Sequence, residues 1–227
     1  MAGGVFLTQV PGRAWLGLAG TLALASVLAW FAPAALLDWQ PALAASEPWR
    51  AFTGAWVHWS PRHLAANLLG AGLVAALGWR ARLPARAALA WALAWPLTQC
   101  GLLLRPELAH YGGLSGVLHA GVAVAACWLL FRPGPPGQPV LPVLPVQPVQ
   151  PVQPVQPRER WIGGAVAVGL IVKLLLEAPW GPSLRPAAPG SEWDIAIVPL
   201  AHASGALAGL ACAAALLGLE WRARIRQ

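Results

Sequence analysis

Charged residues are scarce in this chain of 227 residues: only 10% are Asp, Glu, Lys or Arg, whereas 58% are hydrophobic. A soluble domain carries roughly 25% charged residues, so a water-facing surface of ordinary composition is excluded. Cysteine is also rare. Cys100, Cys127 and Cys212 lie apart in apolar stretches, without the spacing of a disulfide framework or a metal site. We interpret them as small apolar residues, and no motif indicates a metal or an organic cofactor.

Long apolar runs are what the composition provides instead. Six runs have the roughly 17–25 residues that a bilayer core requires, and helices are expected because lipid-exposed backbone must bond to itself. The sequence therefore predicts an all-α polytopic membrane protein with six transmembrane helices. The first run has an alternative interpretation as a cleaved signal peptide, with "APA" at 32–34 as the cleavage site, but its length favours a retained helix. The runs lie near residues 14–32, 62–79, 84–104, 114–131, 161–178 and 195–219.

Arginine is distributed unevenly between the loops that these runs define. The loops on the side of the two termini contain ten arginines and the loops on the other side contain four, so the positive-inside rule places both termini in the cytoplasm of a bacterial inner membrane. We therefore interpret the net charge of +7 as a determinant of membrane topology and not as a sign of nucleic-acid binding. The ten are Arg13, Arg80, Arg82, Arg86, Arg132, Arg158, Arg160, Arg222, Arg224 and Arg226, against Arg50, Arg62, Arg105 and Arg185.

A Pro-Val-Gln repeat divides the chain into unequal parts. Residues 133–157 contain proline at three-residue intervals, which predicts an extended polyproline II spacer on the cytoplasmic side. The alternative is a ligand for a proline-binding partner, which we consider less favourable because repeat expansion needs no partner. Helices 1–4 then lie in 1–132, and helices 5 and 6 of the same core lie in 158–227.

Four polar residues from three separate runs are predicted at one depth in the membrane. His63 and Asn67 lie in the first turns of the second helix, Ser115 begins the fourth, and His202 lies about two turns into the sixth. All three helices run from outside to inside in the predicted topology. Polar groups in the outer half of the bilayer are costly unless they line a wet cavity, so we expect a shared cavity that opens outward.

These residue types fit acyl-transfer chemistry. Ser115 is the candidate nucleophile and His202 the base that activates it. His63 and Asn67 share one helix face and, with the backbone N–H of Ser115, are candidate donors to an oxyanion. No acidic residue is expected beside His202, because Asp194 lies two turns earlier and at the surface. The sequence therefore predicts a Ser–His dyad rather than a triad.

Several neighbours are assigned supporting roles. His119, four residues after the nucleophile, is expected to stack on or bond to the base. Gly113 and Gly116 are expected to let a substrate backbone approach closely, and the spacing of Gly205 and Gly209 is typical of close helix packing.

Other polar residues are given ordinary roles. His58 and His110 are interpreted as packing residues in outer loops. Arg50, with the tryptophan before it, is expected to anchor the first outer loop among lipid headgroups. Lys173 and Glu177 form an i,i+4 pair, read as an interfacial ion pair, or alternatively as a substrate gate.

The combined motifs resemble the rhomboid family of intramembrane serine proteases. The strings are "WRAFTGAWVHWSPRHLAANLLG", "GGLSGVLHA" and "AHASGALAGL", in the family's order and helix assignment. The resemblance implies Ser115 as nucleophile, His202 as base, and His63 and Asn67 as oxyanion donors. Many rhomboids carry tyrosine where this chain has His119.

The compact form and the string "GLSGVLHA" resemble the rhombosortase branch. That resemblance implies transmembrane substrates with a C-terminal tail of Gly-Gly, a helix and a basic end. The product is either released by hydrolysis or transferred to a lipid-derived amine. A catalytically inactive rhomboid-like protein that binds or escorts membrane helices is the alternative. A small transporter is disfavoured because the chain has no internal symmetry.

Overall fold

A computed structural model describes residues 10–132, 157–188, 190 and 194–226, and this part of the chain is all-helical. It contains two isolated β-bridges and no strand. The fold class predicted from the sequence is confirmed at this level, whereas the Pro-Val-Gln repeat lies outside the described residues. The long helices are α1 (Arg13–Ala29), α4 (Pro61–Arg80), α5 (Ala85–Cys100), α6 (Ser115–Phe131), α7 (Pro157–Glu177) and α8 (Pro199–Ile225).

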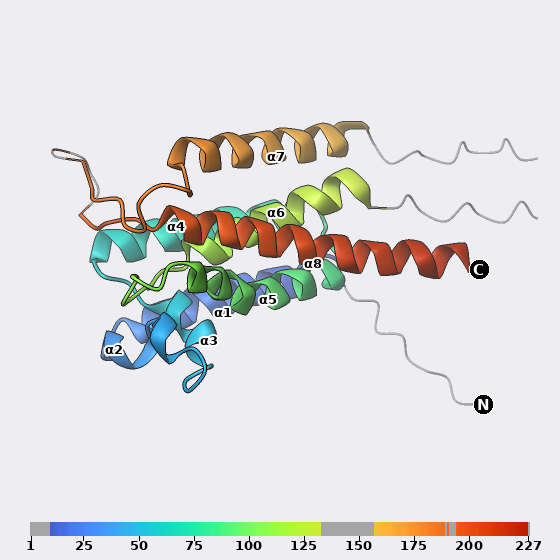
Figure 1. The fold of residues 1–227 in the computed structure, drawn as a ribbon. Helices are drawn as coiled ribbons and strands as arrows, with labels where there is room; N and C mark the ends of the chain where they lie inside the picture. Colours follow the sequence, from blue (N-terminus) through green and yellow to red (C-terminus); the bar gives the residue numbers. More distant parts are fainter. Residues whose placement is uncertain (1–9, 133–156, 189, 191–193, 227) are drawn as a thin grey trace, which may run out of the picture.

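Short helical segments between the long helices were not predicted. In the loop after α1 they are α2 (Ala34–Leu37), η1 (Pro41–Leu43), α3 (Arg50–Thr53) and η2 (Gly54–Trp56), and η3 (Gly101–Leu104) extends α5. They are each three or four residues long, too short to give an apolar period in the sequence. Together they form a folded cap at one end of the molecule, near the start of α6 (Figure 1).

Local chemistry explains where the helices of the site begin. Pro61 and Pro199 occupy the first turn of α4 and α8, where a missing N–H costs nothing. Ser60 caps α4, because its Oγ accepts a hydrogen bond from the His63 N–H at 3.0 Å. These starts determine the depth at which His63 and His202 enter the bundle.

Two of the described helical segments are both long and apolar enough to cross a membrane: Ala85–Leu104 and Pro199–Ile225. α1 and α6 are apolar but have 17 residues each. The association with a membrane that the composition predicts therefore has support from these helices, and the count of six spans remains a prediction.

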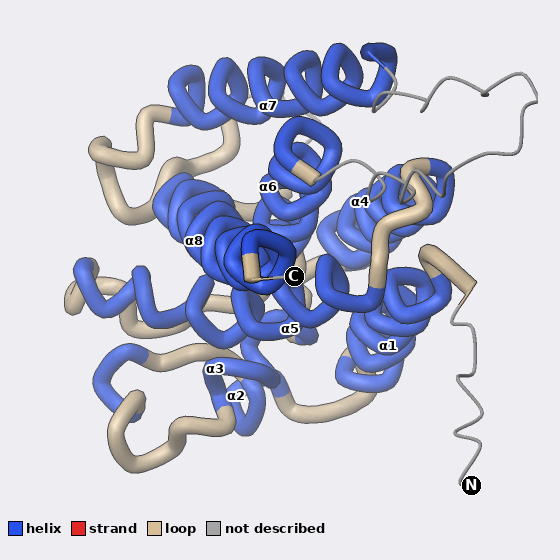
Figure 2. The backbone as a smooth tube through the Cα atoms, turned by 90° about the vertical axis from the view of Figure 1, so that its right-hand side faces the viewer, coloured by secondary structure: helices blue, strands red, loops and turns tan. Residues whose placement is uncertain are grey.

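The centre of the bundle is α6, which packs against α4, α5, α7 and α8 (Figure 2). α1 packs against α4 and α5. Two tryptophans of the core bond to backbone carbonyls of neighbouring helices: Trp15 Nε1 donates to Val74 O at 2.8 Å, and Trp91 Nε1 donates to Val117 O at 2.7 Å. α7 lies at the edge of the bundle, in contact mainly with α6 and only slightly with α8 (Figure 1).

Small residues allow α6 and α8 to approach closely. A Cβ at Gly205 would overlap the Gly116 carbonyl, and a Cβ at Gly209 would overlap the Ala120 carbonyl. The predicted close-packing role of Gly205 and Gly209 is confirmed. Gly116 belongs to the same contact, since a Cβ there would meet Ala201 O at 2.8 Å. Its expected role next to a substrate backbone is therefore wrong: it faces α8.

The predicted arrangement of arginine-rich segments agrees with the course of the chain. The start of α1, the end of α6, the start of α7 and the end of α8 lie together at one end of the bundle (Figure 1). The folded cap and the start of α6 lie at the opposite end. One end of the molecule is thus rich in arginine, and the other holds the polar residues discussed next.

Candidate active site

Ser115 is the first residue of α6, and the segment before it is anchored to the cap. Tyr111 and Trp39 form an antiparallel bridge with two N–H···O bonds of 2.8 Å. The Gly113 N–H donates to Gly54 O at 3.0 Å. Gly113 has φ +145°, a conformation that favours glycine. This turn presents the serine at the helix start, where its backbone N–H has no partner within the helix.

His202 lies beside this serine on α8. Its Nε2 is 2.8 Å from Ser115 Oγ, although the two residues are 87 positions apart in the chain. The histidine is 8% exposed, so the contact is shielded from bulk water. The close packing of α6 on α8 at Gly205 brings the two side chains together. The predicted convergence of hydroxyl and imidazole is confirmed as geometry.

His119 supports the histidine from one turn along α6. Its ring stacks on the His202 ring, with centroids 4.3 Å apart and planes inclined by 11°. Its own Nδ1 bonds to the Ser115 carbonyl oxygen at 2.6 Å, so the ring is fixed in orientation. The stacking predicted for His119 is confirmed.

The second nitrogen of His202 has a partner that the sequence did not predict. Nδ1 lies 2.7 Å from Glu177 Oε2, and the other oxygen, Oε1, lies 2.5 Å from Lys173 Nζ. The prediction that no acidic residue stands beside His202 is wrong. The reason is that Glu177 ends α7, whose place beside α6 brings its last turn over the histidine. The i,i+4 ion pair itself is confirmed.

His63 and Asn67 line the same space from α4, and both are buried. His63 Nδ1 accepts the Trp59 N–H at 3.4 Å, so the ring proton lies on Nε2, the atom next to Gly113. One N–H of the Asn67 amide donates to His63 O at 3.1 Å, which leaves its second N–H as a donor. Both residues therefore offer donors to an anion beside Ser115.

A cavity of about 660 Å³ connects these residues. Its polar lining includes the serine and the four histidines His63, His110, His119 and His202. Its apolar lining comes from α4, α6, α7 and the segment before α8. The predicted shared cavity is confirmed. Asp194 is exposed and accepts a hydrogen bond from Ser60 Oγ at 2.8 Å, so its expected place at the surface is also confirmed.

Next to the cavity, His58 packs against His63 with ring centroids 4.8 Å apart. Burial lowers the pKa of His58 from 6.5 to about 4, against the opposing effect of its contact with the Trp56 carbonyl. His58 is therefore neutral at neutral pH and acts in packing, as its loop position suggested.

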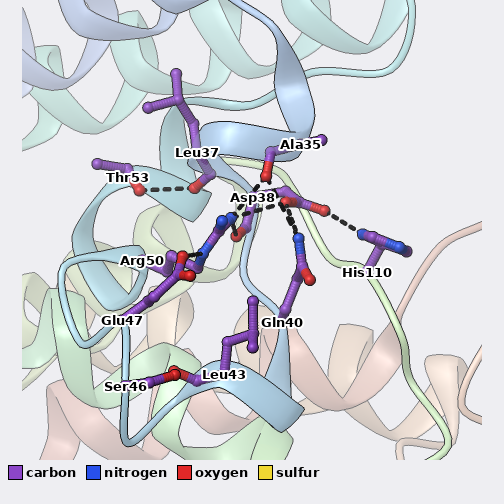
Figure 3. A network of polar contacts seen from close by, with 10 residues as sticks. All are labelled: Ala35, Leu37, Asp38, Gln40, Leu43, Ser46, Glu47, Arg50, Thr53 and His110. Atoms are coloured by element: carbon purple, nitrogen blue, oxygen red, sulfur yellow. Dashed lines mark hydrogen bonds and ion pairs between the residues drawn. The ribbon is translucent and has the colours of Figure 1, made fainter.

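Arg50 does not reach the headgroup region that the sequence suggested, because it is buried in the cap (Figure 3). Its NH1 donates to Asp38 Oδ1 at 3.1 Å and its Nε donates to Glu47 Oε2 at 2.5 Å. The other Asp38 oxygen bonds to His110 Nδ1 at 2.6 Å. His110 is thus part of a buried-carboxylate cluster, formed by Asp38, Arg50, Glu47, Gln40 and His110, rather than an isolated loop residue.

His119, Glu177 and His202 are the described residues whose ligand atoms lie close enough to hold a metal ion, within 4.8 Å of one another. Imidazole lone pairs lie in the ring plane, and the two rings are nearly parallel. Two such nitrogens cannot both point at one ion at about 2.0–2.1 Å. The geometry fits hydrogen bonds from His202 to Ser115 and Glu177 better than metal ligation. The chain matches no known protein family and no curated protein.

Proposed function

We propose that this chain is an intramembrane serine endopeptidase of the rhomboid type. The observation that carries the proposal is the 2.8 Å contact between Ser115 Oγ and His202 Nε2 at the edge of a shared cavity. A serine hydroxyl attacks a peptide carbonyl only when a base takes its proton, and His202 is the base within reach.

The residues supply each step of acyl transfer. Ser115 Oγ forms a bond to the substrate carbonyl carbon while its proton moves to His202 Nε2. The carbonyl oxygen becomes an oxyanion, which the His63 Nε2–H, the Asn67 amide and the Ser115 N–H stabilise. His202 then gives its proton to the leaving amine as the peptide bond breaks. Water, or a lipid amine, then attacks the acyl carbon and gives a proton to His202. The bond to Ser115 Oγ breaks, and the serine oxygen takes that proton from His202 to restore the hydroxyl.

The membrane setting of the proposal rests on the outer surface of the bundle. α7 exposes a row of large apolar side chains, including Val168, Ile171, Leu175 and Leu176. Exposed apolar area of this extent is expected to face lipid. We propose six spans in a bacterial inner membrane, with both termini cytoplasmic, the arginine-rich end inside, and the cavity opening to the periplasmic side. Lipid and transmembrane substrates are then the partners.

The proposed substrates are proteins with a C-terminal tail of Gly-Gly, a transmembrane helix and a basic end. This assignment rests on the resemblance of the string around Ser115 to rhombosortases. The apolar wall of the cavity, formed by residues such as Ala66, Gly70 and Leu73 of α4, suits an unfolded segment of a substrate helix. The alternative is a binding protein that holds membrane helices without cutting them.

Labelling by a fluorophosphonate probe tests the protease proposal, with the full chain in detergent. We expect labelling of the wild type and none in Ser115→Ala or His202→Ala. Ser26→Ala is the matched control, because Ser26 bonds only to its own helix, at Leu22 O, and should leave labelling unchanged. Absence of wild-type labelling, or equal labelling of Ser115→Ala, would favour the binding protein.

Co-expression with a reporter that carries the Gly-Gly–helix–basic tail tests the substrate. Release of its ectodomain should occur with the wild type and disappear with Ser115→Ala. Equal cleavage of an unrelated transmembrane reporter would contradict the proposed substrate class, whereas the proposal of protease activity would stand.

A further inference from the structure

We propose that Glu177 is a positioning residue that completes a Ser115–His202–Glu177 relay from the edge helix α7. The inference rests on the proposed function and adds a third member to its dyad. The carrying observation is the 2.7 Å contact between Glu177 Oε2 and His202 Nδ1. A carboxylate only accepts hydrogen bonds, so it fixes the proton of the neutral ring on Nδ1.

The position of that proton decides whether the histidine can act as a base. With Nδ1 protonated, Nε2 presents its lone pair to Ser115 Oγ at 2.8 Å. When Nε2 takes the serine proton, the ring becomes an imidazolium, and a carboxylate at Nδ1 stabilises this charge. Glu177 thus acts on the reaction through His202, without touching the substrate.

Glu177 is itself held at both oxygens, which is what a positioning role requires. Oε2 bonds to the histidine and Oε1 lies 2.5 Å from Lys173 Nζ. The Glu177 side chain is 17% exposed and that of Lys173 is 46% exposed. The lysine therefore fixes the carboxylate on its solvent side, while the buried side faces the ring.

The C-terminal end of α7 also helps to hold Glu177 in place. The helix stops at Glu177 because Ala178 adopts a left-handed conformation, with φ +46°. The Arg105 guanidinium holds the turn that follows, since NH2 donates to Gly181 O at 2.8 Å. α7 has few contacts with α8, and the hydrogen bond between Glu177 and His202 is one that joins the two helices.

The other polar groups around His202 cannot replace the carboxylate. His119 stacks on the ring face and bonds to the Ser115 carbonyl, so it does not reach Nδ1 in the ring plane. Asp194 bonds to Ser60. The titratable groups that line the cavity with His202 are His119 from α6, Glu177 and Lys173 from α7, His63 from α4, and His110 and Tyr111 from the segment before α6. Asp194, in the loop before α8, faces His63.

The kinetic test measures the rate of fluorophosphonate labelling across pH for the full chain in detergent. We expect Glu177→Gln to react about 100-fold more slowly at neutral pH, because the amide can also stabilise the wrong tautomer. The acid limb of its pH profile should also change, because the ring no longer faces the Glu177 carboxylate. A merely structural role would lower the unfolding temperature and leave the acid limb in place.

Two variants control this experiment. Glu159→Gln makes the same change at the other end of α7, where Glu159 pairs with Arg132, and should keep the wild-type rate and acid limb. Lys173→Met retains the carboxylate and should change the rate less than about 10-fold. Equal rates and equal acid limbs for Glu177→Gln and wild type would overturn the inference.

A second measurement does not depend on protease activity. Nitrogen-15 NMR of labelled histidines should show His202 in the Nδ1–H form, in the wild type and in Ser115→Ala, and a changed tautomer balance in Glu177→Gln. A wild type that shows this signal without any labelling would remove the proposed function and keep the orienting contact. Labelling of a wild type that lacks this signal would contradict the orienting contact and keep the proposed function.

Discussion

Asp38 and Glu177 make the same two contacts in different surroundings. Each carboxylate bonds to a histidine Nδ1 through one oxygen, at 2.6 Å for His110 and 2.7 Å for His202. Each pairs with a cation through the other oxygen, Arg50 for Asp38 and Lys173 for Glu177. The first group lies in the cap between loops, and the second lies between helices at the cavity.

The difference lies in which member of each group is buried. In the cap, Asp38 and Arg50 are buried and His110 is 55% exposed, so its ring ends in solvent. At the cavity, the cation is the exposed member, and the buried His202 leads on to Ser115. The same contacts thus stabilise a loop in one place and orient an imidazole toward the Ser115 hydroxyl in the other. Burial of the histidine distinguishes them.

Asp38→Asn should have the largest effect on folding. It removes the buried carboxylate from beside Arg50 and leaves that buried charge with Glu47, which is partly exposed. Breaking a buried ion pair costs up to about 3–5 kcal/mol. Thermal unfolding in detergent measures the loss. Glu177→Gln should change the unfolding temperature far less, because its cation reaches solvent.

His110→Gln is the control for this contrast. It removes the exposed member of the cap cluster, and exposed charged pairs contribute roughly 0–1 kcal/mol. A loss as large as that of Asp38→Asn would show that the two clusters do not differ in the way that burial predicts.

Lowering the pH should destabilise the folded protein, because the buried His58 side chain takes up a proton more readily in the unfolded chain. Its pKa is about 4 in the folded protein against an ordinary value of 6.5. The unfolded chain therefore binds the proton first as the pH falls, and stability decreases between pH 6.5 and 4. The full shift corresponds to about 3 kcal/mol.

Unfolding temperatures measured across this range should fall less steeply for His58→Gln than for the wild type. An unchanged slope in His58→Gln would contradict the prediction. The comparison also separates unfolding from protonation of the site when activity is lost in acid.

Gly205→Ala should disturb the cavity and spare the cap. Its Cβ would overlap the Gly116 carbonyl and force α8 away from α6. Overpacking of this kind costs about 1–3 kcal/mol, and the separation of Ser115 from His202 should abolish labelling. Gly218→Ala on the same helix meets open space and should preserve both stability and labelling. Labelling that survives in Gly205→Ala would show that the helix contact does not set the catalytic distance.

The long helices were predictable because their apolar runs are continuous, and their bounds lie within about six residues of the predicted ones. The convergence of Ser115, His202, His63 and Asn67 was predictable from helix direction and depth alone. The stacking of His119 followed from its spacing of four residues on α6.

Glu177 could not be predicted as a partner of His202, because the rotation of α7 about its axis depends on packing. The i,i+4 spacing of Lys173 and Glu177 predicted only the ion pair between them, within α7. The burial of Arg50 could not be predicted either, because no periodicity in the cap sequence indicates that Asp38 lies against it. Gly116 was misassigned because a glycine beside a serine looks the same whether it faces a ligand or a helix.

The sequence separation of Ser115 and His202 also determines when the two side chains can first meet during synthesis of the chain. A ribosome adds roughly 5–20 residues per second, so the 87 residues that separate Ser115 from His202 take about 4–17 s to synthesise. Until α8 is synthesised, the nascent chain carries the Ser115 hydroxyl without the His202 imidazole. On the proposed chemistry, it therefore cannot cut neighbouring proteins at the translocon before α8 is in place.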